Sequence, residues 1–294
     1  MKAPFPDIAR RPLARSAAAT LVLLSLAGGA PRPAAAADPV LPIFDAHLHY
    51  SHDAWERLPP DKAIALMREA GLKRAMVSSS SDEGTQRLYD AAPDLVLPVL
   101  RPYRLRGDIG TWLHDPTVIA HLESRLARHR YVAIGEYHVY GADADLPVMR
   151  RVVQLAREHG LYLHSHSDAD AIERQFRQDP SARILWAHSG FDSPERVVQM
   201  LQRYENLWCD LAFRTDHAIE DKVDPAWRAA FIAFPDRFLV GTDTFTPERW
   251  YYVGPHAQGV RRWLADLPPD VAERIAHRNG EALFSDRFDR GGSK

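Results

Sequence analysis

Short β-rich runs alternate with longer amphipathic runs along most of this chain, and this alternation constrains the fold more than any other feature. The β-rich runs cover 43–49, 74–79, 95–100, 132–136, 161–164, 183–188, 207–210 and 238–241. The helical patterns between and after them cover 61–70, 85–91, 116–129, 147–159, 169–178, 194–204, 225–234 and 258–267. Strands alternating with helices in this number over roughly 250 residues are what a (β/α)₈ barrel requires. We therefore predict an α/β fold, a TIM barrel formed as one domain by residues 40–290.

An open doubly wound sheet also alternates strands with helices, but it often carries a glycine-rich phosphate loop. The sequence contains no G-x-G-x-x-G or Walker pattern and no internal repeat. It also has no linker that would divide the chain after residue 40. These observations favour the closed barrel.

The first 36 residues have the composition of a secretory signal peptide. Basic residues (Lys2, Arg10, Arg11 and Arg15) precede an apolar run over 17–30, and small residues follow at 34–36. We predict cleavage near this point and a periplasmic or secreted protein, with a retained N-terminal anchor as the alternative. The Arg10-Arg11 pair also suits a twin-arginine signal, so the Sec and twin-arginine routes both stay open.

The chain carries 37 basic and 39 acidic residues, a formal net charge of −2. This balance argues against a nucleic acid or an anionic membrane as a partner and leaves a small-molecule substrate as the expected one. No stretch after the signal is long enough to insert stably in a membrane. Cys209 is the only cysteine, so the chain forms no internal disulfide despite its predicted export. The sequence leaves the oligomeric state open.

The first predicted strand, I-F-D-A-H-L-H, ends in a pair of histidines. Side chains alternate between the faces of a strand, so one face receives Asp45, His47 and His49 and the other receives Phe44, Ala46 and Leu48. Two adjacent imidazoles at the end of an apolar strand favour a bound divalent transition metal. A hydrogen-bonded histidine pair on an exposed edge is the alternative.

Polar residues also stand at the ends of four later predicted strands: Glu136, His164, His188 and Asp243. The carboxyl ends of barrel strands meet at one mouth, so these side chains are expected to converge with His47 and His49. Imidazoles and carboxylates aimed at one point favour one or two divalent cations as their shared partner. Asp45 and Asp210 are expected to hold imidazole rings in place, although capping of a turn or a buried hydrogen bond is an alternative for each.

Four short motifs follow one another along the chain: H-x-H at 47–49, H-S-G-F at 188–191, N-L-W-C-D at 206–210 and G-T-D at 241–243. The motif I-A-H-R-N-G-E-A-L-F follows at 275–284, near the C-terminus. Over residues 42–284 the sequence therefore resembles the amidohydrolase superfamily of metal-dependent TIM-barrel hydrolases, most closely its amidohydrolase-related branch. The resemblance implies the barrel, a metal centre and a hydrolytic or related reaction, and it implies no particular substrate.

The resemblance implies two arrangements of the site. In the mononuclear arrangement, His47, His49, His164 and Asp243 hold one ion, and His188 positions water or substrate. In the binuclear arrangement, which we favour, Glu136 bridges two ions: His47, His49 and Asp243 complete one site, and His164 and His188 complete the other. A salt bridge is the alternative role for Glu136. Zinc is the expected metal, with manganese, iron or cobalt as alternatives.

Such a site predicts hydrolysis of a small-molecule ester, lactone, amide or phosphoester by metal-activated water. A bound divalent ion lowers the pKa of its water from about 15.7 towards 7. Asp243 is the expected proton acceptor, and His188 is expected to stabilise the oxyanion if it is not a ligand. The alternatives are a metal-dependent decarboxylase with one ion and a non-catalytic periplasmic barrel that binds a metal or ligand.

Three further residues are expected to contact the substrate. Arg101 follows the third strand and Arg214 the seventh, where either can clamp a carboxylate or phosphate, although a surface salt bridge is the commoner role. Tyr137 follows Glu136 and is expected to shape the pocket. His166 is an alternative to His164 as the metal ligand, but we expect it in the loop that follows.

Overall fold

The computed structural model describes residues 40–285 and 288–289, and the predicted signal segment lies outside them. Eight strands of the described chain form one sheet in the order β1-β2-β3-β4-β5-β6-β7-β10. They are β1 Ile43–His49, β2 Leu72–Ser78, β3 Val96–Leu100, β4 Ala133–His138, β5 Tyr162–His166, β6 Ile184–Trp186, β7 Leu207–Asp210 and β10 Phe238–Leu239. Every neighbouring pair in this sheet is parallel.

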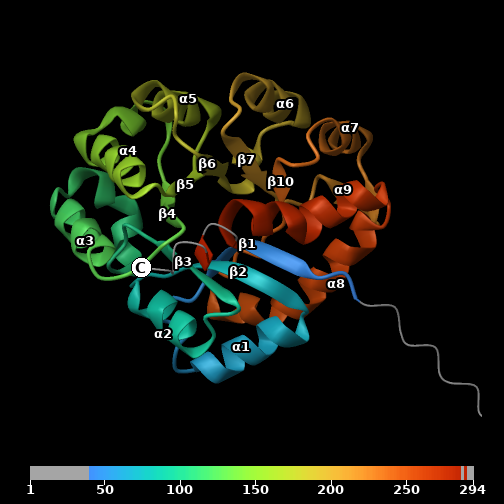
Figure 1. Ribbon diagram of the computed structural model, residues 1–294, viewed down its shortest axis with the longest axis horizontal. Helices are drawn as coiled ribbons and strands as arrows, with labels where there is room; N and C mark the ends of the chain where they lie inside the picture. Colours follow the sequence, from blue (N-terminus) through green and yellow to red (C-terminus); the bar gives the residue numbers. More distant parts are fainter. Residues whose placement is uncertain (1–39, 286–287, 290–294) are drawn as a thin grey trace, which may run out of the picture. The chain divides into compact units, whose positions relative to one another are not determined.

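Backbone hydrogen bonds between β1 and the segment after β10 bring the two edges of this sheet together. The N–H of Ala46 donates to the carbonyl of Val240 at 2.9 Å, and the N–H of Asp243 donates to the carbonyl of His47 at 2.7 Å. Helices surround the strands, as Figure 1 shows in a view onto the barrel. The predicted TIM barrel is therefore confirmed.

The helices of the described chain follow the predicted pattern closely. They are α1 Pro60–Glu69, α2 Glu83–Ala91, α3 Thr117–Leu126, α4 Pro147–His159, α5 Ala169–Gln178, α6 Pro194–Arg203, α7 Pro225–Ala233, α8 Val253–Leu264 and α9 Pro269–Glu273. Side chains of Asp168, Ser193 and Asp224 cap the N-termini of α5, α6 and α7. Gly160 ends α4 in the left-handed conformation, with φ 64°, that glycine adopts most readily.

Helix α8 begins at Val253, five residues before the expected start, and the sequence pattern missed this first turn because it contains Gly254 and Pro255. A short antiparallel hairpin of β8 Ala218–Ile219 and β9 Lys222–Val223 in the connection between β7 and α7 was not expected. None of the described helices combines the length with the apolar character needed to cross a bilayer.

The described core consists of two clusters on the two sides of the strands. The larger cluster joins the outer faces of the strands to the helices, and the smaller contains Phe44, Met76, Leu97 and Leu239 from the inner faces. Phe284 packs against Phe44 at 6.0 Å between ring centroids and joins this inner cluster. The barrel is therefore a packed interior with its polar groups confined to one end.

An irregularity in β1 turns the two histidines into the barrel. The register with β2 shifts between Asp45 and Leu48, so Ala46 packs in the inner cluster while Leu48 packs in the outer one. The expectation that these two residues share a face is wrong, because strict alternation fails across a bulge. Without the shift, His47 would follow the inward Ala46 and point towards the helices.

Candidate metal centre and active site

His47 and His49 leave β1 with their Nε2 atoms 3.2 Å apart. The Nδ1 atom of His47 lies 3.2 Å from Oδ2 of Asp210. The Nδ1 atom of His49 lies 3.1 Å from the carbonyl oxygen of Ser78 and 2.9 Å from its hydroxyl. A carbonyl oxygen only accepts hydrogen bonds, so Nδ1 of His49 carries the hydrogen. In the neutral ring, the lone pair is then on Nε2, where it faces His47.

His188 repeats this arrangement from the opposite side of the barrel. Its Nδ1–H donates to the carbonyl of Ala212 at 2.7 Å, and its Nε2 lies 3.5 Å from Oε1 of Glu136. It was expected at the end of a strand, but β6 stops at Trp186 and His188 lies in a turn with φ 54°. Left-handed backbone costs a non-glycine residue about 1–2 kcal/mol. Asp243 has φ 54° as well, and such strain is typical of residues held for function.

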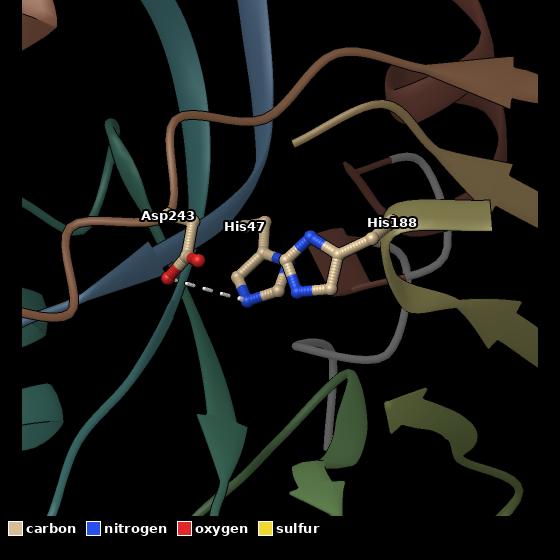
Figure 2. Close-up of side chains that lie close together, drawn as sticks. All are labelled: His47, His188 and Asp243. Atoms are coloured by element: carbon tan, nitrogen blue, oxygen red, sulfur yellow. Dashed lines mark ion pairs between the residues drawn. The ribbon is translucent and has the colours of Figure 1, made fainter. Parts of the chain in front are cut away.

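Two buried carboxylates face these imidazoles. Oε2 of Glu136 lies 3.3 Å from Nε2 of His49, and its Oε1 lies 3.5 Å from Nε2 of His47. Oδ1 of Asp243 lies 3.4 Å from Nε2 of His49 and 3.9 Å from that of His47. Figure 2 shows His47 between Asp243 and His188, with the side chains directed towards one another.

These donor atoms fit a divalent cation. Neutral Nε2 atoms and carboxylate oxygens are all acceptors, and acceptors 3.3–3.5 Å apart repel unless a positive charge lies among them. Ligands about 2.1 Å from one ion are separated by roughly these distances. The surroundings of His47 favour positive charge as well. Burial disfavours the protonated imidazole, but Glu136 and Asp210 raise the pKa of His47 well above its usual value.

The structure separates His164 from His166. Nε2 of His164 lies 2.9 Å from Oδ2 of Asp210, behind His47, and burial lowers the pKa of this imidazole to about 4. Nδ1 of His166 lies 2.7 Å from Oε1 of Glu136. His166 is therefore the histidine of β5 that meets the carboxylate. His166 was expected in a loop, but β5 extends to this residue and places it at the mouth of the barrel.

Asp210 connects His47, His164 and His188. Its Oδ2 contacts His47 and His164, and its Oδ1 accepts the backbone N–H groups of His188 at 2.9 Å and Ala212 at 3.0 Å. Asp45 does not contact an imidazole. Its carboxylate accepts the backbone N–H groups of His47 and Thr242, so of its two predicted roles the structure supports the capping one.

Arg101 lines the mouth, but it is paired with Glu136 and does not present a free guanidinium. It donates to the backbone carbonyl and to Oε2 of Glu136, both at 2.9 Å. The salt bridge predicted as the alternative for Glu136 is thus present beside its imidazole contacts. Oε2 accepts the bond from Arg101 and also lies 3.3 Å from Nε2 of His49, whereas Oε1 faces His47, His166 and His188.

Arg214 and Tyr137 do not line this mouth. Arg214 donates to the carbonyls of His188 and Asp192 and holds the turn that carries His188. Tyr137 is fully buried, and its hydroxyl donates to Gln175. Tyr137 points outward because it alternates with its neighbours in β4, and Arg214 is turned towards the backbone around His188, so neither lines the cavity above the histidines.

A cavity of about 320 Å³ opens above the histidines. Its walls include Tyr103, His138, Phe191, Phe213 and Phe245, and of these only His138, which follows Glu136 and Tyr137, was expected near the pocket. The sequence could have indicated the three phenylalanines by their position, because each follows the end of a strand by a few residues. Their orientation depends on loop conformation, which sequence patterns do not give.

The sequence profile described as Amidohydrolase matches residues 44–285. The chain belongs to the amidohydrolase family. Members of this family typically bind divalent metals, and the described groups His47–His49–Glu136 and His47–His188–Asp243 bring suitable donor atoms within 4.8 Å of one another. The chain is an enzyme of amidohydrolase type.

Solved structures share the fold of this amidohydrolase at low sequence identity. An uncharacterised TIM-barrel protein from Bordetella bronchiseptica is 16% identical, with TM-score 0.58 over 83% of this chain and 98% of that one. A candidate 2-pyrone-4,6-dicarboxylic acid hydrolase from Pseudomonas putida is 15% identical, with TM-score 0.57 over 83% and 98%. A β-aspartyl dipeptidase from Fervidobacterium islandicum is 14% identical, with TM-score 0.53 over 83% and 72%. No curated protein matches the sequence.

Proposed function

We propose that this amidohydrolase is an exported hydrolase that opens an ester, lactone or amide bond of a small molecule with the help of two divalent ions. The observation that carries the proposal is the set of Nε2 atoms of His47, His49 and His188, which converge on Glu136 and Asp243 while their Nδ1 atoms are held by acceptors. A ring fixed through Nδ1 presents Nε2 to a metal.

The contacts divide the ligands between two ions. His49 faces Oε2 of Glu136 and has Asp243 beside it, whereas His166 and His188 face Oε1, and His47 lies 3.5 Å from Oε1 and 3.2 Å from His49. Glu136 therefore fits the role of a bridge, and His166 replaces His164 in the second site. Zinc suits this set of imidazoles and carboxylates, as do manganese, iron and cobalt.

When bound, such ions generate hydroxide from water at neutral pH and polarise the scissile carbonyl. Asp243 is the base in this proposal. Burial opposes its ionisation, but His47 and His49 lower the pKa of this carboxyl to about 2, so it is ionised at neutral pH and accepts the proton of the water.

His138 supplies a hydrogen-bond donor beside the metal ligands. The hydroxyl of Tyr103 accepts the backbone N–H of His138 at 2.8 Å and lies 3.0 Å from its Nδ1, and in this proposal the hydroxyl donates its hydrogen to Nδ1. The neutral ring then carries its hydrogen on Nε2, where it donates to the carbonyl oxygen of the substrate. Tyr103 and His138 both line the cavity.

Hydrolases of several kinds occur among the structural neighbours, including the dipeptidase and a molinate hydrolase that is 13% identical with TM-score 0.55. They support the reaction class and leave the substrate of this chain to experiment.

Metal analysis and kinetics of the purified protein test the proposal. We expect two divalent ions per chain, turnover of lactone or ester probes, and loss of that turnover on chelation with recovery on adding metal. Asp243→Asn is expected to lower kcat by about 10²–10⁴, the usual contribution of a general base. The matched control is Asp224→Asn. Asp224 caps helix α7 far from the site, asparagine can keep this cap, and kcat should be unchanged.

Turnover that survives complete metal removal would contradict the proposal. One ion per chain together with release of CO₂ would instead favour the decarboxylase. Export is supported by the composition of residues 1–36 and is tested separately, by sequencing the N-terminus of the protein from the periplasm and the medium. A mature protein that begins at residue 1 would contradict cleavage.

A further inference from the structure

We infer that the mouth of the barrel selects uncharged substrates that carry a flat apolar group, such as an aromatic ring fused to the scissile lactone or attached to the scissile ester or amide. The inference rests on the proposed hydrolysis at the metal centre and specifies its substrate class. Three exposed phenylalanines and two neutralised arginines carry it.

Phe191, Phe213 and Phe245 lie on three different loops and line the same cavity. They are 51%, 48% and 43% exposed, although residues of this type are normally buried. A cluster of exposed aromatic rings around a cavity is typical of a surface that buries an apolar ligand. Phe213 and Phe245 meet edge to face, with centroids 5.7 Å apart and planes at 78°, and thereby form a continuous wall.

Contacts with neighbouring side chains hold these rings in place. Phe191 stacks on His188, with centroids 4.7 Å apart and planes at 14°. The guanidinium of Arg249 lies 4.7 Å from the centroid of Phe213 and 5.4 Å from that of Phe245. Arg249 also donates to the carbonyl of Thr242 at 2.6 Å, which fixes it to the loop that carries Asp243. The wall is therefore positioned before a substrate arrives, and the binding cost of ordering it is small.

The charges around the cavity disfavour an anionic substrate. Two arginines line it: Arg101 is paired with Glu136, and Arg106 is paired with Asp53 and donates to the carbonyl of Phe245. Away from the metal ions, a substrate carboxylate would have to displace one of these carboxylates or lie against the apolar wall, and an unpaired charge in such surroundings is costly. Uncharged esters, lactones and amides meet neither penalty.

The volume sets the size of the apolar group. A cavity of about 150 Å³ accommodates benzene. The 320 Å³ present here accommodates one aromatic ring together with the reacting bond.

A matched series of lactones tests this selection on the metal-loaded enzyme. Dihydrocoumarin carries an aromatic ring fused to a six-membered lactone, valerolactone is the same lactone without the ring, and dihydrocoumarin carboxylate adds a negative charge. We expect kcat/KM for dihydrocoumarin to exceed the value for each of the other two by at least tenfold. Equal values for the aromatic and aliphatic lactones, or faster turnover of the carboxylate, would overturn the inference.

Phe213→Ala combined with Phe245→Ala is expected to remove most of the preference, by raising KM for dihydrocoumarin while leaving kcat/KM for valerolactone within twofold. The matched control is Tyr251→Ala, which removes an exposed aromatic side chain that does not line this cavity and should change neither value. A double variant that keeps the full preference would refute the role of this wall.

A binding measurement separates failure of the inference from failure of the proposed function. Dihydroquinolinone is the lactam counterpart of dihydrocoumarin and valerolactam is its counterpart without the ring, and calorimetry follows both with and without metal. Tighter binding of dihydroquinolinone, lost in the double phenylalanine variant, supports the inference even if no lactone is hydrolysed, in which case only the reaction is wrong. Equal binding of the two lactams beside measurable lactone hydrolysis would leave the reaction standing and reject the aromatic selection.

Discussion

Replacing Asp210 with asparagine should weaken metal binding although this residue does not face the proposed ions. Asp210 is fully buried, and its two oxygens hold two imidazoles and two backbone N–H groups. Asparagine has one acceptor oxygen, which can keep the backbone N–H groups of His188 and Ala212. Its amide hydrogens then face His47 and His164, and the acceptor that fixes Nδ1 of His47 is gone.

The contacts give the size of the effect. Loss of a residue that orients a ligating histidine costs about 10–100-fold in metal affinity, or about 1.4–2.8 kcal/mol. The metal-free protein also loses two hydrogen bonds to an ionised group, each contributing about 1.5–3 kcal/mol. We therefore expect Asp210→Asn to lower the free energy of unfolding without metal by about 3 kcal/mol or more.

Competition with a chelator measures the metal affinity, and urea denaturation of the metal-free protein measures the stability. Ser78→Ala is the graded control: His49 keeps its hydrogen bond to the carbonyl of Ser78 and loses only the contact with the hydroxyl, so the affinity should fall less than threefold. If Asp210→Asn folds and binds metal with wild-type affinity, the argument that Asp210 orients His47 is refuted. If the variant is too unstable to assay, Asp210→Glu, which keeps the charge, should recover stability and part of the affinity.

Two further predictions concern histidines on either side of the site. His166→Asn is expected to lower the bound metal from two ions to one, because it removes the imidazole that contacts Oε1 of Glu136. His164→Asn should keep two ions, because His164 contacts Asp210 instead. Metal analysis of both variants measures this, and the opposite pattern would identify His164 as the ligand. His217 lies away from the site, and burial lowers the pKa of its imidazole to about 4. As the pH falls, His217 is protonated in the unfolded chain near pH 6.5 but in the folded chain only near pH 4. The free energy of unfolding is therefore highest above about pH 6.5 and falls by up to about 3 kcal/mol as the pH drops towards 4. Urea denaturation across this pH range should show a flatter profile for His217→Gln, and an unchanged slope would count against the assignment.

The sequence alone was sufficient to predict the barrel. Strand and helix patterns alternate along the chain, and residues that end or cap helices, such as Gly160 and Ser193, stand at the boundaries between them. Each of these local preferences agrees with the global fold. The same periodicity predicted that His47, His49, Glu136, His188 and Asp243 would gather, because parallel strands all deliver their carboxyl ends to one mouth, and the structure brings these five side chains together.

Tertiary structure decided which side chains complete the mouth. The choice between His164 and His166 depends on how far β5 extends and on Asp210, a residue 46 positions away from His164. Arg101 and Arg214, predicted from sequence as possible clamps for a substrate, bond in the structure to Glu136 and to the turn of His188. Periodicity reports which face of an element is apolar, but the direction of a side chain beyond a strand end depends on long-range hydrogen bonds and loop packing, which no local pattern records.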